Sequence, residues 1–181
     1  MTGSLTVVGL GYVGLPLAYE ASRSGMRVSG LDTNTSLVES LSNGESHIDD
    51  IDSGQLCAMI KAGFRATTEP DCISDSEVVV ICVPTPLDDD GTPDIGAVKA
   101  ATRVVSQHLR PGSLVVLEST TYPGTTEDIV RPILEAGSGL AAGTDFFLAY
   151  SPERIDPGNL EWGFRNTPKV VGGFTQACTQ V

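Results

Sequence analysis

The 181-residue sequence is short of basic residues, with 11 Lys and Arg against 23 Asp and Glu and a formal net charge of −12. Nucleic acids and anionic membrane surfaces are bound by clustered Lys and Arg, which this chain lacks, so neither is expected as a partner. No apolar run is long enough to span a bilayer. The N-terminus also lacks the basic segment and apolar core of a signal peptide, and we therefore expect a cytoplasmic protein.

Cysteine and histidine are scarce as well. The four cysteines contain no C-x-x-C pair, and only two histidines are available to join a metal site. The sequence therefore supports neither a disulfide framework nor a zinc site, and no metal is expected. Cys82 falls within an apolar run and is expected to be a small core residue.

A glycine pattern follows the first apolar run of the chain. Residues 5–8 are expected to form a buried strand, and Gly9, Gly11 and Gly14 follow it with G-x-G-x-x-G spacing. Gly9 permits the tight turn, Gly11 leaves room for a pyrophosphate, and Gly14 lets the next helix pack closely on the strand. That helix is expected from about Tyr12 to Ser24, so the N–H groups around Tyr12 and Val13 should point at the pyrophosphate.

An acidic residue completes this unit. Residues 27–32 are expected to form the second strand, which ends at Asp32, 18 residues after Gly14. A carboxylate there can accept a hydrogen bond from the 2′-hydroxyl of an adenosine ribose and repel a 2′-phosphate, and no Arg follows in residues 33–36. The unit therefore predicts binding of NAD rather than NADP. The alternative is a solvated Asp that ends an ordinary βαβ unit.

Strand and helix patterns alternate along the rest of the chain and predict a Rossmann-like α/β fold, a doubly wound parallel sheet forming a single domain over residues 1–181. Further strands are expected at 64–68, 77–83, 113–118, 146–150 and 168–173. Further helices are expected from Asn34 or Thr35 to Leu41, at 53–62, from Pro93 or Asp94 to about residue 110, and at 125–136.

Two loops at the carboxyl ends of the predicted strands are candidates for ligand contact, because ligands bind at that edge of an open α/β sheet. The first loop, residues 84–93, contains three prolines and three acidic residues. It is either a turn with solvated charges or, as we favour, a segment that brings Val83, Pro84 and Thr85 beside the cofactor ribose. Thr120 and Thr121 follow the strand at 113–118 and are the second candidates.

Five stretches of the chain together resemble the N-terminal NAD-binding domain of the UDP-glucose/GDP-mannose dehydrogenase family. These stretches are residues 8–18, 82–86, 117–126, 151–159 and 168–173. The forms Thr-Thr-Tyr-Pro-Gly-Thr and Ser-Pro-Glu-Arg look most like members acting on UDP-N-acetylhexosamines. A β-hydroxyacid dehydrogenase is another possibility, because its cofactor domain begins with a similar sequence. The Ser-Pro-Glu-Arg block argues against that family.

The resemblance implies a two-step oxidation of a sugar C6 alcohol to a carboxylate, with two NAD per turnover and a cysteine-bound intermediate. It implies that Thr85 and Thr121 lie near the nicotinamide. It further implies that Glu153 orients or deprotonates the water that hydrolyses the acyl intermediate, with Thr121 bonding the same water. The alternative for Glu153 is an ion pair with Arg154 or Arg165.

Family members also carry a second domain with the nucleophilic cysteine and a third that completes the sugar-nucleotide site, and neither is expected within these 181 residues. Cys178 lacks the surroundings of that nucleophile. The chain is thus expected to be the cofactor domain of a UDP-sugar dehydrogenase, inactive alone. The alternative is a stand-alone NAD-binding module with a regulatory or partner-binding role. The sequence leaves open which sugar is oxidised and whether a homodimer forms.

Overall fold

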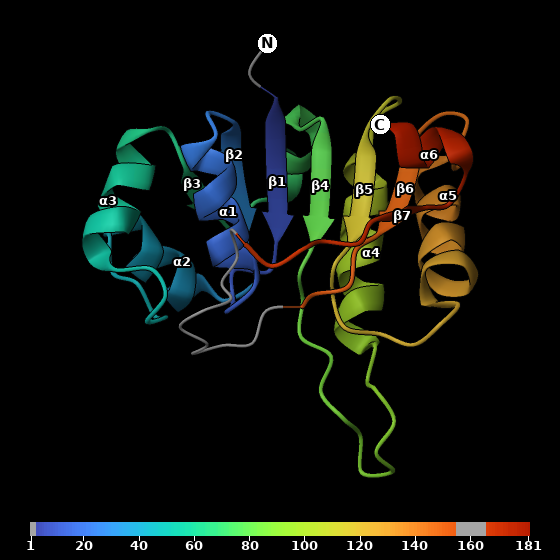
Figure 1. Cartoon of the computed structure of the whole chain (residues 1–181), viewed down its shortest axis with the longest axis horizontal. Helices are drawn as coiled ribbons and strands as arrows, with labels where there is room; N and C mark the ends of the chain where they lie inside the picture. Colours follow the sequence, from blue (N-terminus) through green and yellow to red (C-terminus); the bar gives the residue numbers. More distant parts are fainter. Residues whose placement is uncertain (1–2, 155–165) are drawn as a thin grey trace.

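The computed structural model describes residues 3–154 and 166–181, which build a seven-stranded sheet with the order β3-β2-β1-β4-β5-β6-β7 (Figure 1). The strands are β1 (Ser4–Val8), β2 (Arg27–Leu31), β3 (Arg65–Thr67), β4 (Val78–Ile81), β5 (Leu114–Leu117), β6 (Phe147–Tyr150) and β7 (Gly172–Gly173). The helices are α1 (Gly14–Arg23), α2 (Thr35–Ser42), α3 (Ser53–Lys61), η1 (Pro70–Asp75), α4 (Gly96–His108), η2 (Thr125–Val130), α5 (Arg131–Ser138) and α6 (Gln176–Gln180).

Strands β1 to β6 are parallel, and only β7 runs antiparallel, beside β6. The chain moves outward from β1 to β3, then returns to the other side of β1 and moves outward again. The strand order therefore reverses between β1 and β4, which is the switch point at which doubly wound sheets bind their ligands. The doubly wound α/β prediction is confirmed.

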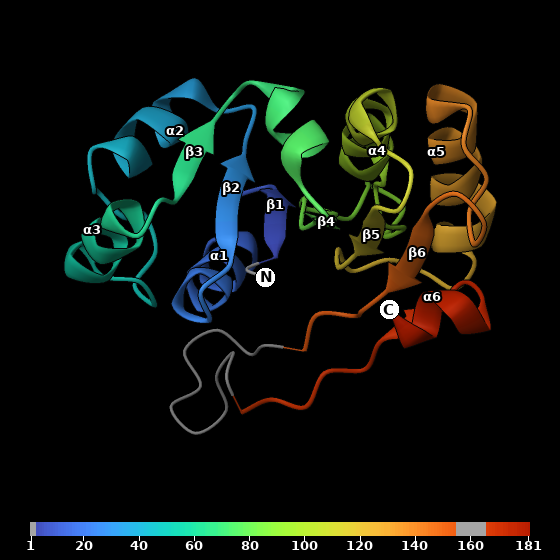
Figure 2. The same cartoon turned by 90° about the horizontal axis from the view of Figure 1, so that it is seen from above.

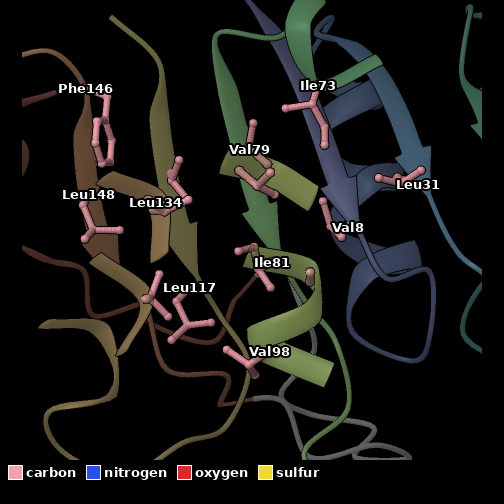
Figure 3. Close-up of a cluster of buried hydrophobic side chains, with 14 of the residues drawn as sticks. Val8, Leu31, Ile73, Val79, Ile81, Val98, Leu117, Leu134, Phe146 and Leu148 are labelled. Atoms are coloured by element: carbon pink, nitrogen blue, oxygen red, sulfur yellow. The ribbon is translucent and has the colours of Figure 1, made fainter. Parts of the chain in front are cut away.

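Helices cover both faces of the sheet. Seen from above, α1, α3 and α6 lie on one side, and η1, α4 and α5 lie on the other (Figure 2). The strands are apolar on both faces because both are covered. In β4, Val79 and Ile81 pack into the cluster beneath α4 and α5, whereas Val80 packs into the cluster beneath α1 and α3. Figure 3 shows part of the first cluster, in which Phe146 and Leu117 are fully buried.

Several helices and strands begin or end at other residues than predicted. Helix α1 begins at Gly14, not Tyr12. Helix α4 begins at Gly96, not at 93 or 94, because Asp94 belongs to the preceding loop: its N–H donates to the Pro86 carbonyl at 2.7 Å, and its carboxylate accepts the Gly96 N–H at 2.7 Å.

The predicted helix at 125–136 starts with a π-helical turn, η2, before α5. The predicted strand at 168–173 was too long, since only Gly172 and Gly173 pair, with Tyr150 and Ala149.

Candidate cofactor-binding site

A cavity of about 800 Å³ lies at the carboxyl ends of the strands, which form the lower edge of the sheet in Figure 1. Its walls come from the segments that follow each of the strands β1 to β6, together with α2 and α4. Ten of the residues predicted from the sequence line it: Gly9, Gly11, Tyr12, Val13, Asp32, Val83, Pro84, Thr85, Thr120 and Glu153. Gly14 and Thr121 do not line it; Gly14 is buried in the first turn of α1, and Thr121 is half-buried in the turn after β5.

The three glycines of the turn have different physical reasons to be glycine. Gly9 has φ +95°, and a Cβ there would lie 2.6 Å from the Cys82 carbonyl oxygen. A Cβ on Gly14 would overlap the Gly9 carbonyl oxygen. Gly11 is different, because a Cβ there would meet nothing within 4 Å. The fold itself therefore requires the first and third glycines, whereas the second only keeps the cavity open at that point.

Asp32 is held in place by backbone donors. Its Oδ2 accepts the Leu10 N–H at 2.9 Å, and its Oδ1 accepts the Asn34 N–H at 2.9 Å. The first bond joins the end of β2 to the glycine turn after β1. Both oxygens keep further acceptor capacity, since a carboxylate offers about four lone pairs. The carboxylate at the cavity wall is thus pre-oriented to accept a ligand hydroxyl.

His47 lies next to this end of the cavity and was not predicted to take part in it. Its ring stands edge-on to Tyr12, with ring centroids 6.4 Å apart. Burial lowers the pKa of His47, although the nearby Asp32 carboxylate and the Leu10 carbonyl act in the opposite direction. His47 lies in an irregular acidic segment between α2 and α3. Because this segment has no periodic pattern of apolar residues, the sequence does not indicate which of its side chains point inward.

The far end of the cavity is formed by β4 and the turn after β5. Ser119 Oγ donates to the Val83 carbonyl at 2.8 Å, which ties these two segments together. This bond places Thr120 beside Val83, Pro84 and Thr85 on the cavity wall. The position of these two loops on the cavity wall is therefore consistent with the prediction that they contact a ligand.

A group of charged side chains closes this end. Lys169 Nζ contacts Glu118 Oε1 directly and lies 3.3 Å from Glu153 Oε2. Glu118 is only 3% exposed, and it lines the cavity together with Glu153. Of the two predicted alternative partners of Glu153, Arg154 offers its backbone N–H at 2.6 Å, and Arg165 lies outside the described residues. Glu118 and Lys169 were not predicted as site residues.

Cys82 lies beneath this charged group, and its Sγ is 3.6 Å from Glu118 Oε2. Burial raises the pKa of the Cys82 thiol to about 12, an effect that the Lys169 charge partly offsets. The thiol is therefore protonated near neutral pH and is not a nucleophile. This agrees with the prediction that Cys82 is a core residue.

Within residues 3–154 and 166–181, no group of three or more His, Cys, Asp or Glu is arranged to hold a metal ion. No helix in this same part of the chain has the length and apolar character needed to cross a membrane. The cavity residues fit a dinucleotide: an open backbone turn ahead of a helix N-terminus suits a diphosphate, and a pre-oriented carboxylate suits a ribose.

Comparisons with known proteins point the same way. Residues 3–181 match the UDP-glucose/GDP-mannose dehydrogenase family, NAD binding domain. The chain is 38% identical to protein CapL of Staphylococcus aureus over 97% of its length, and 37% identical to UDP-N-acetyl-D-glucosamine 6-dehydrogenase of Pseudomonas aeruginosa over 94%. It spans about 40% of the length of each of these relatives.

Solved structures of nucleotide-sugar dehydrogenases also match this chain. NDP-N-acetyl-D-galactosaminuronic acid dehydrogenase from Methanosarcina mazei superposes with a TM-score of 0.90 at 36% identity, over 99% of this chain and 40% of that one. UDP-D-ManNAc dehydrogenase from Pyrococcus horikoshii gives 0.89 at 34% identity, over 98% of this chain and 42% of that one. A 3-hydroxyisobutyrate dehydrogenase from Mycobacterium tuberculosis, at 18% identity and a TM-score of 0.57, shares the fold alone.

The glycine turn, the carboxylate after β2 and the family match agree over nearly the whole chain, and they show that it belongs to the UDP-glucose/GDP-mannose dehydrogenase family, of which it is an NAD-binding domain.

Proposed function

We propose that this chain holds NAD for the C6 oxidation of a UDP-N-acetylhexosamine, a reaction that it does not complete alone. The observation that carries the cofactor assignment is the open space at Gly11, where a Cβ would meet no protein atom. Gly11 lines the cavity, so the absence of a side chain there leaves room for a ligand diphosphate to approach the backbone.

The roles of the cavity residues follow from what each one offers. The turn formed by Gly9, Gly11, Tyr12 and Val13 leads into α1, whose N-terminal N–H groups and dipole favour the cofactor diphosphate. This local attraction is needed because the chain as a whole is strongly acidic. Asp32 accepts the ribose 2′-hydroxyl, whereas a 2′-phosphate would meet its negative charge. NAD supplies the hydride acceptor when it is bound.

The cavity wall formed by the segments after β4 and β5 faces the reacting part of the cofactor, its nicotinamide half. Val83, Pro84, Thr85 and Thr120 bound the space available to the nicotinamide ribose. In the proposed hydrolytic step, Glu153 takes a proton from a water, and Thr121 bonds the same water. The cavity-lining position of Glu153 supports its role. Thr121 lies outside that lining, so its role rests on the resemblance alone.

The substrate and the remaining machinery are also part of the proposal. Relatives at 34–38% identity include enzymes named for UDP-N-acetylglucosamine and UDP-N-acetylmannosamine, which supports a UDP-sugar substrate. We assign the nucleophilic cysteine and most of the sugar pocket to domains outside these 181 residues, and we expect a cytoplasmic protein that can pair as a homodimer. The dehydrogenase names of the relatives favour this function over a stand-alone regulatory module.

Calorimetric titration of the 181-residue chain with NAD and with NADP tests the cofactor assignment. We expect saturable NAD binding and much weaker NADP binding. Asp32→Asn keeps one side-chain oxygen for one of the two backbone donors and removes the charge, so the preference for NAD over NADP should narrow by about tenfold or more, as expected for a hydrogen bond to a charged group. Equal binding of the two cofactors by the unmodified chain, or no binding, would contradict the assignment.

A further inference from the structure

His47 lies against the turn that we assign to the cofactor diphosphate, although it does not line the cavity itself. Its ring stands edge-on to Tyr12, a lining residue that is 61% exposed, and the two ring centroids are 6.4 Å apart. The carbonyl of Leu10, the residue between Gly9 and Gly11, is the backbone acceptor that acts on the imidazole. The imidazole therefore meets the turn on both sides of Gly11.

The segment that carries His47 is fixed in this place. Ser46 Oγ donates to the Ile48 carbonyl at 3.1 Å and accepts the Ile48 N–H at 3.3 Å, which closes a turn around His47. Ile48 and Ile51 are 5% and 3% exposed, and both pack into the core cluster beneath α1 and α3. The imidazole is therefore held beside the glycine turn before any ligand binds.

Most charged groups around His47 are carboxylates. Asp32, after β2, is the carboxylate whose charge acts on the ring, and Tyr12 is the titratable group in contact with it. Exposed carboxylates also lie on the neighbouring segments: Glu39 on α2, Glu45, Asp49 and Asp50 beside His47 in the chain, and Asp52 at the N-cap of α3. The basic residues Arg23 and Lys61 fall in the last turns of α1 and α3. A proton on His47 therefore adds a positive charge to an acidic part of the site.

A bound diphosphate changes the conditions for that proton. Partial burial lowers the pKa of His47, which favours the neutral imidazole in the free chain. Negative charge brought close to the ring favours the protonated form instead. A group whose pKa is higher in the bound than in the free state takes up a proton on binding, and the affinity for the ligand then falls as the pH rises through that range.

We propose that His47, in its protonated form, attracts the cofactor diphosphate to the glycine turn, so that binding of NAD is coupled to the uptake of a proton. The proton comes from the buffer and is held on the imidazole. Its charge adds to the attraction of the backbone N–H groups and the dipole of α1. The inference rests on the proposed NAD site and adds to it a dependence of cofactor affinity on pH.

Calorimetric titration of the 181-residue chain with NAD at about pH 6 and about pH 8, on either side of the usual histidine range, tests this coupling. Repeating the titration in two buffers of different ionisation enthalpy counts the protons taken up. We expect about threefold tighter binding at the lower pH, as for a unit charge several ångströms away in a well-screened site, together with uptake of part of a proton. An affinity that does not change with pH would overturn this inference alone.

Two variants of His47 identify the group that takes up the proton. His47→Gln keeps a side-chain donor for the Leu10 carbonyl, and His47→Phe keeps a ring beside Tyr12, but neither side chain can be protonated. Both variants should therefore bind NAD with little dependence on pH and little proton uptake. Protonation of the cavity carboxylates instead of His47 predicts that the pH dependence persists in both variants, and that result would also overturn the inference.

His108 supplies the matched control, because it is the second of the two histidines in the chain. It lies at the end of α4, outside the cavity lining, with its Nδ1 3.6 Å from Asp71 Oδ1. His108→Gln should therefore keep the full pH dependence and proton uptake, and loss of both in this variant would contradict the assignment to His47. Failure of the unmodified chain to bind NAD at either pH would overturn the proposed function and this inference with it.

Discussion

Replacement of Gly11 by Ala separates the needs of the fold from the needs of the ligand. The added Cβ meets no protein atom within 4 Å, and Gly11 is not among the glycines with positive φ. A Gly→Ala change at such a position stabilises a protein by about 0.4–1 kcal/mol, mainly by restricting the unfolded chain. For a chain of this length, that predicts a rise in Tm of roughly 1–4 °C.

Cofactor binding should respond in the opposite direction. The methyl group enters the part of the cavity that the glycine keeps open, so the diphosphate loses its close approach to the backbone. We expect the affinity for NAD to fall by at least about tenfold, equivalent to roughly 1.4 kcal/mol. Thermal unfolding without cofactor and calorimetric titration with NAD measure the two effects separately.

Two other glycines provide the controls. Gly172→Ala also adds a Cβ that meets nothing within 4 Å, at a position without positive φ, but it lies outside the cavity lining, so Tm should rise by a similar amount while NAD affinity stays nearly constant. Gly14→Ala would overlap the Gly9 carbonyl oxygen and should destabilise the fold by roughly 1–3 kcal/mol or more. Unchanged NAD affinity in a folded Gly11→Ala chain would refute the reasoning that a ligand explains this glycine.

Three other perturbations have clear expected outcomes. At pH 8, iodoacetamide should label the exposed Cys57 in the native chain and leave Cys82 unmodified, because burial raises the pKa of the Cys82 thiol to about 12; mass spectrometry of peptides reads this out, and early labelling of Cys82 would contradict its buried position. Gly137→Ala places a Cβ against Ser106 between α4 and α5 and should cost roughly 1–3 kcal/mol in urea unfolding, whereas an unchanged midpoint would mean that these helices separate easily. In a complete enzyme, Glu153→Gln should slow turnover and let an acyl-enzyme accumulate, detectable by intact mass; turnover at the unmodified rate would remove the hydrolytic role.

The local patterns of the sequence were enough to predict the glycine turn and Asp32, which lie at one end of the cavity. The glycine spacing, the helix after it and Asp32 all lie within one βαβ unit, where backbone conformation and strand register follow from neighbouring residues. The structure adds the reason for each glycine and the two backbone donors that orient Asp32.

The charged group at the other end could not be predicted in the same way. Glu118 and Lys169 meet only because β7 turns back antiparallel beside β6, and no short pattern encodes that return. The start of α4 was predicted too early for a related reason: the loop ahead of it is closed by a bridge between Leu87 and Pro93 and by the Asp94 bonds, which compete with helix formation.

The central place of β1 has a consequence for the order of folding. Leu5 pairs with Val28 on one side, but its other partner is Val78, which is far along the chain. Pairings between such distant residues carry a high loop-closure cost and form late. Because the Cys82 carbonyl after β4 packs against Gly9, the glycine turn after β1 takes its final shape only when that distant pairing closes. During synthesis on the ribosome, the glycine turn therefore emerges early, but it becomes a binding site only after β4 has left the exit tunnel.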